Sequence, residues 1–146
     1  MEKKICSSKE IVTTRLVKSE DLNHHKTLFA GRTAEWFVES GFLAAASMIP
    51  ADNIVCLKIH GMYFTRPVNP GEIIKFTSKI VYTGKSSLFA FVKMTKGNND
   101  EFVVSGFITF INVDENTKPA PHYIEIDPQT DEEKELYDQA KALKNK

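Results

Sequence analysis

The segment from about Leu28 to Met48 constrains the fold more than any other part of the chain. Small and apolar residues recur through it at the spacing of an α-helix until Pro50 ends the pattern. They are Ala34, Phe37, Gly41, Ala44, Ala45 and Met48. A helix that is apolar on most of its sides is normally buried on several faces. In a chain of 146 residues, this requires the remaining segments to wrap around the helix.

Runs rich in Val, Ile, Phe, Tyr and Thr flank this helix and predict the strands that wrap it. One run precedes the helix, Glu10–Val17, and four follow it: Ile54–Thr65, Glu72–Tyr82, Ser87–Lys96 and Glu101–Val113. The later runs are separated by short turn segments, Pro67–Gly71, Thr83–Lys85 and Gly97–Asp100. Turns of this length join antiparallel neighbours. A strand, a long buried helix and an antiparallel meander predict an α+β fold.

The last part of the chain predicts an arm and a short helix. Prolines punctuate Asn116–Pro128, which we expect to be extended. Thr130 and Glu133 have the spacing of a capping box at the start of a helix. One face of that helix carries Leu136, Ala140 and Leu143. We expect it to lie on the surface.

Composition excludes several classes of protein. Acidic and basic residues balance at 19 each, so nothing in the net charge favours a nucleic acid or an anionic membrane as partner. The longest apolar run, Phe42–Pro50, is too short to span a bilayer, which takes about 20 residues. Cys6 and Cys56 form no CxxC pair and indicate free thiols in the cytoplasm. We expect one soluble domain over residues 1–146, with its core at about 10–114.

Glu39 is the only charged residue from Trp36 to Met48. The residues three and four positions away on the helix include no basic partner, whereas Glu35 has Arg32 one turn before it. Burial would raise the pKa of the Glu39 carboxyl toward the range of a general base at neutral pH. An ion pair with another element, or a place at a subunit edge, explains Glu39 equally well.

The polar segment DLNHHKTLFAGR leads into this helix through Gly31. Free N–H groups at a helix N-terminus suit a carbonyl oxygen that gains negative charge, and Asn23 is placed to orient a water molecule or the carbonyl. As a rule, an asparagine in such a loop only forms a turn. His24 and His25 are adjacent and point in different directions, and no second cluster has metal-ligand spacing, so we expect no catalytic metal.

The segment TGKSS, together with Arg66, has the chemistry of a phosphate contact. Lys85, Ser86 and Ser87 can donate hydrogen bonds to phosphate oxygens beside the accessible backbone of Gly84. The spacing is not that of a Walker motif. Without further support such a segment is more often a plain hairpin turn with a solvated lysine.

Five motifs follow one another between about Val12 and Val113: NHHKTLFAGR, an acid on the following helix, MYFTRPVNPGE, GKSS and SGFITFINVD. In this order they resemble the hot-dog-fold acyl-CoA thioesterases, the bacterial and cytosolic acyl-CoA hydrolases. The family has a Gly-Gly pair where this chain has Ala30 and Gly31. The resemblance implies a curved antiparallel sheet wrapped around the central helix and the hydrolysis of acyl-CoA to free acid and CoA.

The resemblance also implies roles for single residues. Asn23 and Glu39 would be catalytic, and the backbone N–H near Gly31 would stabilise the oxyanion. The CoA contacts would come from Arg66, Lys85, Ser86 and Ser87. No metal or cofactor is implied, beyond CoA as part of the substrate. Two subunits would join their sheets and share each active site, with Asn from one and the acid from the other, and the dimers would form tetramers or hexamers.

The position of the acid depends on the direction of counting. Counted forward from Asn23, the family acid falls on Val38; counted back from Phe64, it falls on Glu39. A one-residue insertion near 31–35 reconciles the two counts, and Glu35 is the weaker alternative acid. Two other functions are weighed: a hot-dog hydratase or dehydratase, for which His24 and His25 are the only histidines near the helix, and an acyl-CoA-binding protein without catalysis.

Overall fold

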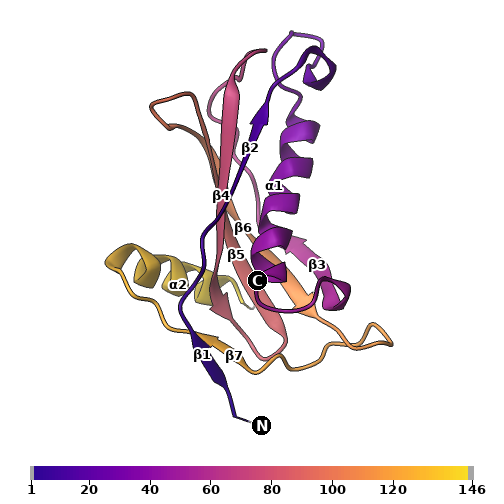
Figure 1. Ribbon diagram of the computed structural model, residues 1–146, viewed down its shortest axis with the longest axis vertical. Coiled ribbons are helices and arrows are strands. Elements are labelled where there is room, and N and C mark those ends of the chain that lie inside the picture. The colour runs from indigo at the N-terminus through magenta and orange to yellow at the C-terminus, as the bar shows by residue number, and fades with distance from the viewer. Residues whose placement is uncertain (1, 145–146) are drawn as a thin grey trace.

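A computed structural model describes residues 2–144 and shows one long helix on one face of a twisted sheet and a second helix across the other face (Figure 1). The strands are β1 (Lys4–Cys6), β2 (Ile11–Leu16), β3 (Ile54–Ile59), β4 (Ile73–Thr83), β5 (Ser87–Lys96), β6 (Glu101–Asn112) and β7 (Ile124–Ile126). The helices are α1 (Ala30–Ala46) and α2 (Asp131–Leu143), and short 3-10 turns lie at Ser19–Asp21 and Ala51–Asn53. The predicted α+β layout is confirmed.

The main sheet has the strand order β2-β4-β5-β6-β3, with every neighbouring pair antiparallel. Because α1 lies in sequence between β2 and β3, the chain crosses the face of the sheet that α1 covers before it returns to the opposite edge. The two strands that flank α1 in sequence therefore form opposite edges. This order decides which side chains of the helix face which edge.

One face of α1 forms the core with the sheet. Phe37, Ala44 and Ala45 have no exposed surface. Gly41 lets the helix approach β6, since a Cβ there would lie 3.0 Å from the Ile108 side chain. The helix begins two residues later than predicted because Leu28 is held in extended form, with its N–H donating to the Val68 carbonyl at 2.8 Å.

The predicted strand Ile54–Thr65 is too long, because β3 ends at Ile59. Gly61 has φ = 126°, a conformation outside a regular strand that side-chain-bearing residues rarely adopt. The chain still runs beside β6, with the His60 N–H donating to the Phe107 carbonyl at 2.9 Å. The Gly61 carbonyl oxygen approaches so closely that a Cβ on Gly106 would lie 2.5 Å from it. The residues after Ile59 thus form an irregular segment along the sheet.

The helix α2 begins at the predicted cap and packs more deeply than predicted. The Thr130 hydroxyl accepts a hydrogen bond from the Glu133 N–H at 3.1 Å. We expected a helix on the surface, but one side of α2 is buried. Its Leu136 and Ala140 pack on the face of the sheet that lies away from α1, called the outer face below. There they pack against Val81, Tyr82 and Phe89. The burial of this apolar face holds the C-terminal part of the chain against the domain.

The predicted arm at 116–128 contains a strand that the sequence did not indicate. Strand β7 pairs in parallel with β1, in the register Lys4↔Ile124 to Cys6↔Ile126. This pair is a separate two-stranded sheet at the base of the molecule (Figure 1). Both cysteines are free, and within residues 2–144 no helix is long and apolar enough to cross a membrane.

Candidate functional site

The Asn23 side chain closes its own loop. Its Oδ1 accepts hydrogen bonds from the N–H groups of His25 at 2.8 Å and Thr27 at 3.2 Å, and its Nδ2 donates to the Thr27 hydroxyl at 3.0 Å. Lys26 has φ = 63° in this tight turn. The turn-forming role weighed for Asn23 is therefore present. Asn23 also lines a cavity, so the two roles do not exclude each other.

The N-terminus of α1 offers unsatisfied donors. No side chain caps the helix at Phe29. Among residues 2–144, the N–H groups of Ala30 and Gly31 donate no recorded hydrogen bond, whereas those of Arg32 and Thr33 donate to the Phe29 carbonyl. The first N–H groups of a helix carry partial positive charge and favour a negative ligand atom. The donors expected near Gly31 are thus free in the chain.

A cavity of about 280 Å³ joins this region to the loop after β3. Asn23, Ala30 and Thr33 line one side of it. The other side is the segment from Phe64 to Val68, with Val103 of β6. The structure therefore places Asn23, the start of α1 and Arg66 around one space, although they are far apart in sequence.

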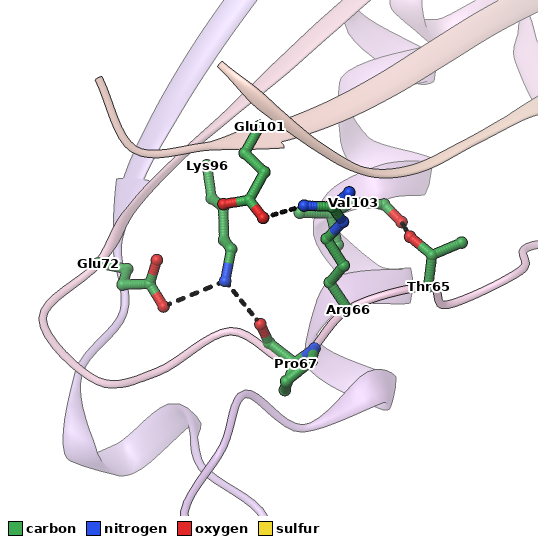
Figure 2. Close-up of polar contacts among 7 residues, drawn as sticks. All are labelled: Thr65, Arg66, Pro67, Glu72, Lys96, Glu101 and Val103. Carbon is green, nitrogen blue, oxygen red and sulfur yellow. Dashed lines mark hydrogen bonds and ion pairs between the residues drawn. The ribbon is translucent and has the colours of Figure 1, made fainter. Parts of the chain in front are cut away.

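Figure 2 shows that Arg66 is engaged by a carboxylate. Its guanidinium forms an ion pair with Glu101 at the start of β6, and both side chains are about half exposed. A phosphate that binds Arg66 must compete with Glu101 or share the guanidinium with it. The sequence did not predict this partner, which lies 35 residues away.

The loop that carries Arg66 is fastened to the hairpin of β5 and β6. The Thr65 hydroxyl donates to the Val103 carbonyl at 2.5 Å. The Lys96 ammonium donates to the Pro67 carbonyl at 2.8 Å and lies 3.5 Å from Glu72 (Figure 2). These contacts hold the wall opposite Asn23 in a defined position.

Glu39 lies on the side of α1 that faces β2. Its Oε1 is 2.7 Å from Nη2 of Arg15, and the Arg15 guanidinium lies 4.8 Å from the centre of the Trp36 ring. The Glu39 side chain is 52% exposed. The expectation of a desolvated carboxylate is therefore wrong for the single chain. The ion pair with another element, weighed above as the alternative, is present.

The opposite flank of α1 carries no carboxylate. Phe42 packs edge-on against Phe110 of β6, which neighbours β3, with ring centres 6.2 Å apart. Val38, one turn before Phe42, packs against the core on the same flank. Successive helix residues are about 100° apart, so Val38 and Glu39 face different edges of the sheet. Glu35 pairs with Arg32 at 3.7 Å and lines the same depression as Glu39.

The turn with Lys85, Ser86 and Ser87 lines a third depression, of about 300 Å³. The Ser87 hydroxyl accepts a hydrogen bond from the Gly84 N–H at 3.2 Å, so it shapes the turn. Lys85 is exposed, and no ion pair is recorded for it within the described residues. The depression also includes His60, which the sequence did not single out.

His60 joins the loop after β3 to the outer face of the sheet. Its Nε2 lies 2.6 Å from the Thr109 hydroxyl, and its ring stacks on Phe89 with centres 6.0 Å apart. Burial, together with the charge of Lys58, lowers the pKa of His60. A neutral imidazole is favoured in such a setting. No sequence motif points to this residue, because its partners come from distant strands.

Within one chain, the predicted site residues fall into three separate depressions. Asn23 and Arg66 share the first, Glu35 and Glu39 the second, and the Lys85 turn the third. The two loop histidines lie side by side, with ring centres 4.0 Å apart. In the range 2–144 no group of three or more His, Cys, Asp or Glu side chains has the arrangement of a metal site.

Comparisons with known proteins agree on one family. Residues 25–103 match the model of the thioesterase superfamily. An acyl-CoA thioester hydrolase of Bacillus subtilis, YkhA, itself uncharacterized, is 27% identical over 143 residues, which cover 95% of this chain and 82% of the relative.

Solved structures agree with this match. A hexameric acyl-CoA thioesterase is 30% identical, with a TM-score of 0.84 over 93% of this chain and 88% of that one. An acyl-CoA hydrolase from Staphylococcus aureus, in complex with butyryl-CoA, CoA and CoA disulfide, is 26% identical, with a TM-score of 0.82 over 91% of this chain and 80% of that one. The hot-dog fold expected from the sequence is confirmed.

Proposed function

Because the chain belongs to the thioesterase superfamily, we propose that it hydrolyses acyl-CoA thioesters to the free acid and CoA. The observation that carries the proposal is the cavity that joins Asn23, the uncapped start of α1 and the Arg66 loop. It combines free backbone donors with an apolar wall, which suits a thioester carbonyl.

In the proposed mechanism the thioester carbonyl oxygen accepts hydrogen bonds from the N–H groups of Ala30 and Gly31. Asn23 orients the attacking water or the carbonyl. The carboxylate of Glu39 takes a proton from the water, whose oxygen bonds to the carbonyl carbon. The C–S bond then breaks, and the proton passes to the CoA thiolate. General-base catalysis of this kind contributes about 10² to 10⁴ in rate. Glu35 is the second candidate for the acid.

A second copy of the chain supplies the carboxylate in this proposal, because no carboxylate lines the Asn23 cavity. Strand β3 is a free edge of the main sheet, and it exposes Val55, Leu57 and Ile59. An exposed apolar edge strand is a template for pairing with another strand. We infer a homodimer joined at β3, which assembles further into tetramers or hexamers; one solved relative is a hexamer.

The CoA part of the substrate is assigned to the basic loops. Arg66, Lys85, Ser86 and Ser87 are the proposed contacts, on the rims of two depressions. Crystals of the S. aureus relative contain CoA, which supports a CoA ligand here. Two free cysteines support a cytoplasmic location.

The flanks of α1 favour one other function, the binding of acyl-CoA without hydrolysis. A dimer joined at β3 brings the partner to the flank of Val38 and Phe42, whereas Glu39 lies toward β2 in an ion pair with Arg15. If Glu39 of one chain cannot reach the Asn23 cavity of the other, the dimer can bind acyl-CoA but has no general base for its hydrolysis.

One assay separates the two functions. Thiol release is measured with acyl-CoA of short, medium and long chains, with and without chelator, beside equilibrium binding of the same compounds. We expect metal-independent release. Binding without release at any chain length would instead establish the binding protein. In that case Val38→Asp, which puts a carboxylate on the β3 flank, should raise the rate, whereas Leu43→Asp, on an exposed part of α1, should not.

A further inference from the structure

Thr33, near the start of α1, is a polar residue of the Asn23 cavity that none of the roles assigned above uses. It is 3% exposed and lines the cavity together with Ala30. These two residues are three positions apart, which places them on the same face of the helix. No motif in the sequence points to this threonine. The cavity therefore has a hydroxyl group close to the free N–H groups of α1.

The Thr33 hydroxyl has no recorded hydrogen-bond partner within residues 2–144. A threonine in a helix can donate from its hydroxyl to the carbonyl four residues earlier. For Thr33 this is the Phe29 carbonyl, which already accepts the N–H groups of Arg32 at 2.9 Å and of Thr33 itself at 3.1 Å. A carbonyl oxygen has two lone pairs. The usual acceptor is thus occupied, and the hydroxyl is left without it.

The oxygen of this hydroxyl is open to the cavity. Two hydroxyl oxygens in the described part of the chain, those of Ser40 and Thr95, are closed off from solvent without a partner. The Thr33 oxygen is not one of them, so it keeps accessible surface although almost all of the residue is buried. The cavity is the space that Thr33 lines, so the oxygen can reach a ligand there.

The other polar side chains of the cavity are already engaged. Arg66 pairs with Glu101, and the Thr65 hydroxyl donates to a backbone carbonyl of β6 (Figure 2). The Asn23 Oδ1 accepts N–H groups of its own loop. Among the described residues that line the cavity, Thr33 is thus the polar one whose side chain has no recorded partner. A nearly buried hydroxyl without a partner is costly, which is a reason to expect that a ligand supplies one.

We propose that the Thr33 hydroxyl donates a hydrogen bond to the thioester carbonyl oxygen, as a third donor beside the N–H groups of Ala30 and Gly31. The Cα–Cβ bond of a helical residue tilts toward the helix N-terminus, so the Thr33 side chain leans to the end of α1 that carries these N–H groups. The hydrogen bond strengthens as the oxygen gains negative charge during the attack of water, and the proton stays on Thr33 throughout. That the ligand is a thioester rests on the proposed function.

Thr33→Val tests this role, because valine has nearly the shape of threonine and lacks the hydroxyl. We expect kcat to fall about a hundredfold, the lower end of the loss for one oxyanion donor, with a small change in KM. Thr33→Ser keeps the hydroxyl and should recover most of kcat. The matched control is Thr95→Val, the same substitution at a threonine of β5 that is 4% exposed and lies outside the cavity. The control should leave kcat unchanged.

A second measurement does not need turnover. The infrared carbonyl stretch of acyl-CoA with an isotope-labelled carbonyl carbon is recorded in complex with a full chain that carries Glu35→Ala and Glu39→Ala, which removes both candidate acids. A hydrogen bond to a carbonyl oxygen lowers its stretching frequency. We expect the band to lie at lower frequency in this chain than in the same chain with Thr33→Val.

The two measurements separate this inference from the proposed function. If wild type hydrolyses acyl-CoA and Thr33→Val changes neither kcat nor the band, the inference is overturned and the proposed function stands. If no chain hydrolyses acyl-CoA but Thr33→Val moves the band, the inference stands and hydrolysis is overturned. A loss of kcat without a change of the band means that Thr33 acts on the water instead, which overturns the stated role. If acyl-CoA does not bind at all, both proposals are overturned.

Discussion

Arg15 of β2 and Glu39 of α1 form an ion pair of 2.7 Å that ties the edge strand to the outer side of the helix. The same guanidinium lies over the Trp36 ring, so one side chain joins the strand to the helix through charge and through an aromatic face. The contact gives Glu39 a structural explanation that does not require catalysis. A substitution of Glu39 can therefore change stability as well as turnover.

Arg15→Ala should lower stability modestly. An exposed ion pair contributes about 0.2–1 kcal/mol and an exposed cation–π contact about 0.5–1 kcal/mol. For a chain of this size, a loss of about 1 kcal/mol lowers Tm by roughly 2–4 °C. Calorimetry measures this shift. Lys18→Ala, which removes a more exposed pair with Glu20, is the control and should change Tm less. A loss above about 3 kcal/mol would show that the contact is more than a surface pair.

Asn23→Ala and Glu39→Ala should each abolish turnover, and the two variants should partly rescue each other when co-expressed. In a two-fold dimer of one chain of each kind, one site receives both altered residues and the other receives both intact ones. Random pairing makes about half of the dimers mixed, so roughly a quarter of wild-type activity should return. Two different affinity tags isolate the mixed dimers for the thiol-release assay.

The same experiment with Glu35→Ala in place of Glu39→Ala identifies the acid. Glu35 and Glu39 line one depression and are one turn apart, so they form a matched pair. Rescue that occurs only with Glu39 supports the proposal, and rescue only with Glu35 transfers the role. Doubly tagged dimers that stay inactive with both would mean that the site is not shared between chains in this way.

Gly106→Ala should destabilise the protein by about 1–3 kcal/mol, the usual cost of overpacking. The new Cβ would lie 2.5 Å from the Gly61 carbonyl oxygen, which is backbone and cannot rotate away. Gly31→Ala is the comparison, because its Cβ would meet only the end of the exposed Phe29 ring. Urea unfolding curves of both variants test the difference. If Gly106→Ala and Gly31→Ala lose the same free energy of unfolding, the segment after β3 can move to make room for the new Cβ.

His122 should make the protein less stable in mild acid. Burial lowers the pKa of His122, and its Nδ1 accepts the Ile124 N–H at 2.9 Å while Nε2 donates to the Ser87 carbonyl at 2.9 Å. Between the lowered pKa and the ordinary value of about 6.5, the unfolded chain binds more protons than the folded chain. Stability therefore rises with pH in this window and is lost as pH falls below about 6.5.

The measurement compares urea midpoints at pH 7.5 and pH 5.5. His122→Asn should be less stable than wild type at the higher pH but lose less on acidification, because it has no imidazole to protonate. The control is His24→Asn, which changes an exposed loop histidine. Its urea midpoint should fall between the two pH values as much as that of wild type. If the urea midpoint of His122→Asn falls as much between pH 7.5 and pH 5.5 as that of wild type, this imidazole does not contribute to the loss of stability in acid.

The sequence by itself determined the elements whose signals are local. The apolar periodicity from Leu28 to Met48 located α1 to within two residues at each end. The limits of β5, Ser87–Lys96, agree with the prediction at both ends, since β-branched and aromatic residues stop there at turn residues. Local signals also gave the cap of α2 at Thr130. In these cases neighbouring residues carry enough of the conformational preference to set the structure.

Only the tertiary structure decided which distant side chains contact one another and which side of α1 each residue occupies. Glu39 meets Arg15, 24 residues away, and Lys144 meets the turn at Gly84. The pairing of β1 with β7 has no signature in either segment. Such contacts depend on how the sheet orders its strands, because a side chain's neighbours across a fold are set by topology and twist rather than by adjacent residues. The sequence shows which groups are available, and the packing of α1 between two opposite sheet edges decides which of them can meet.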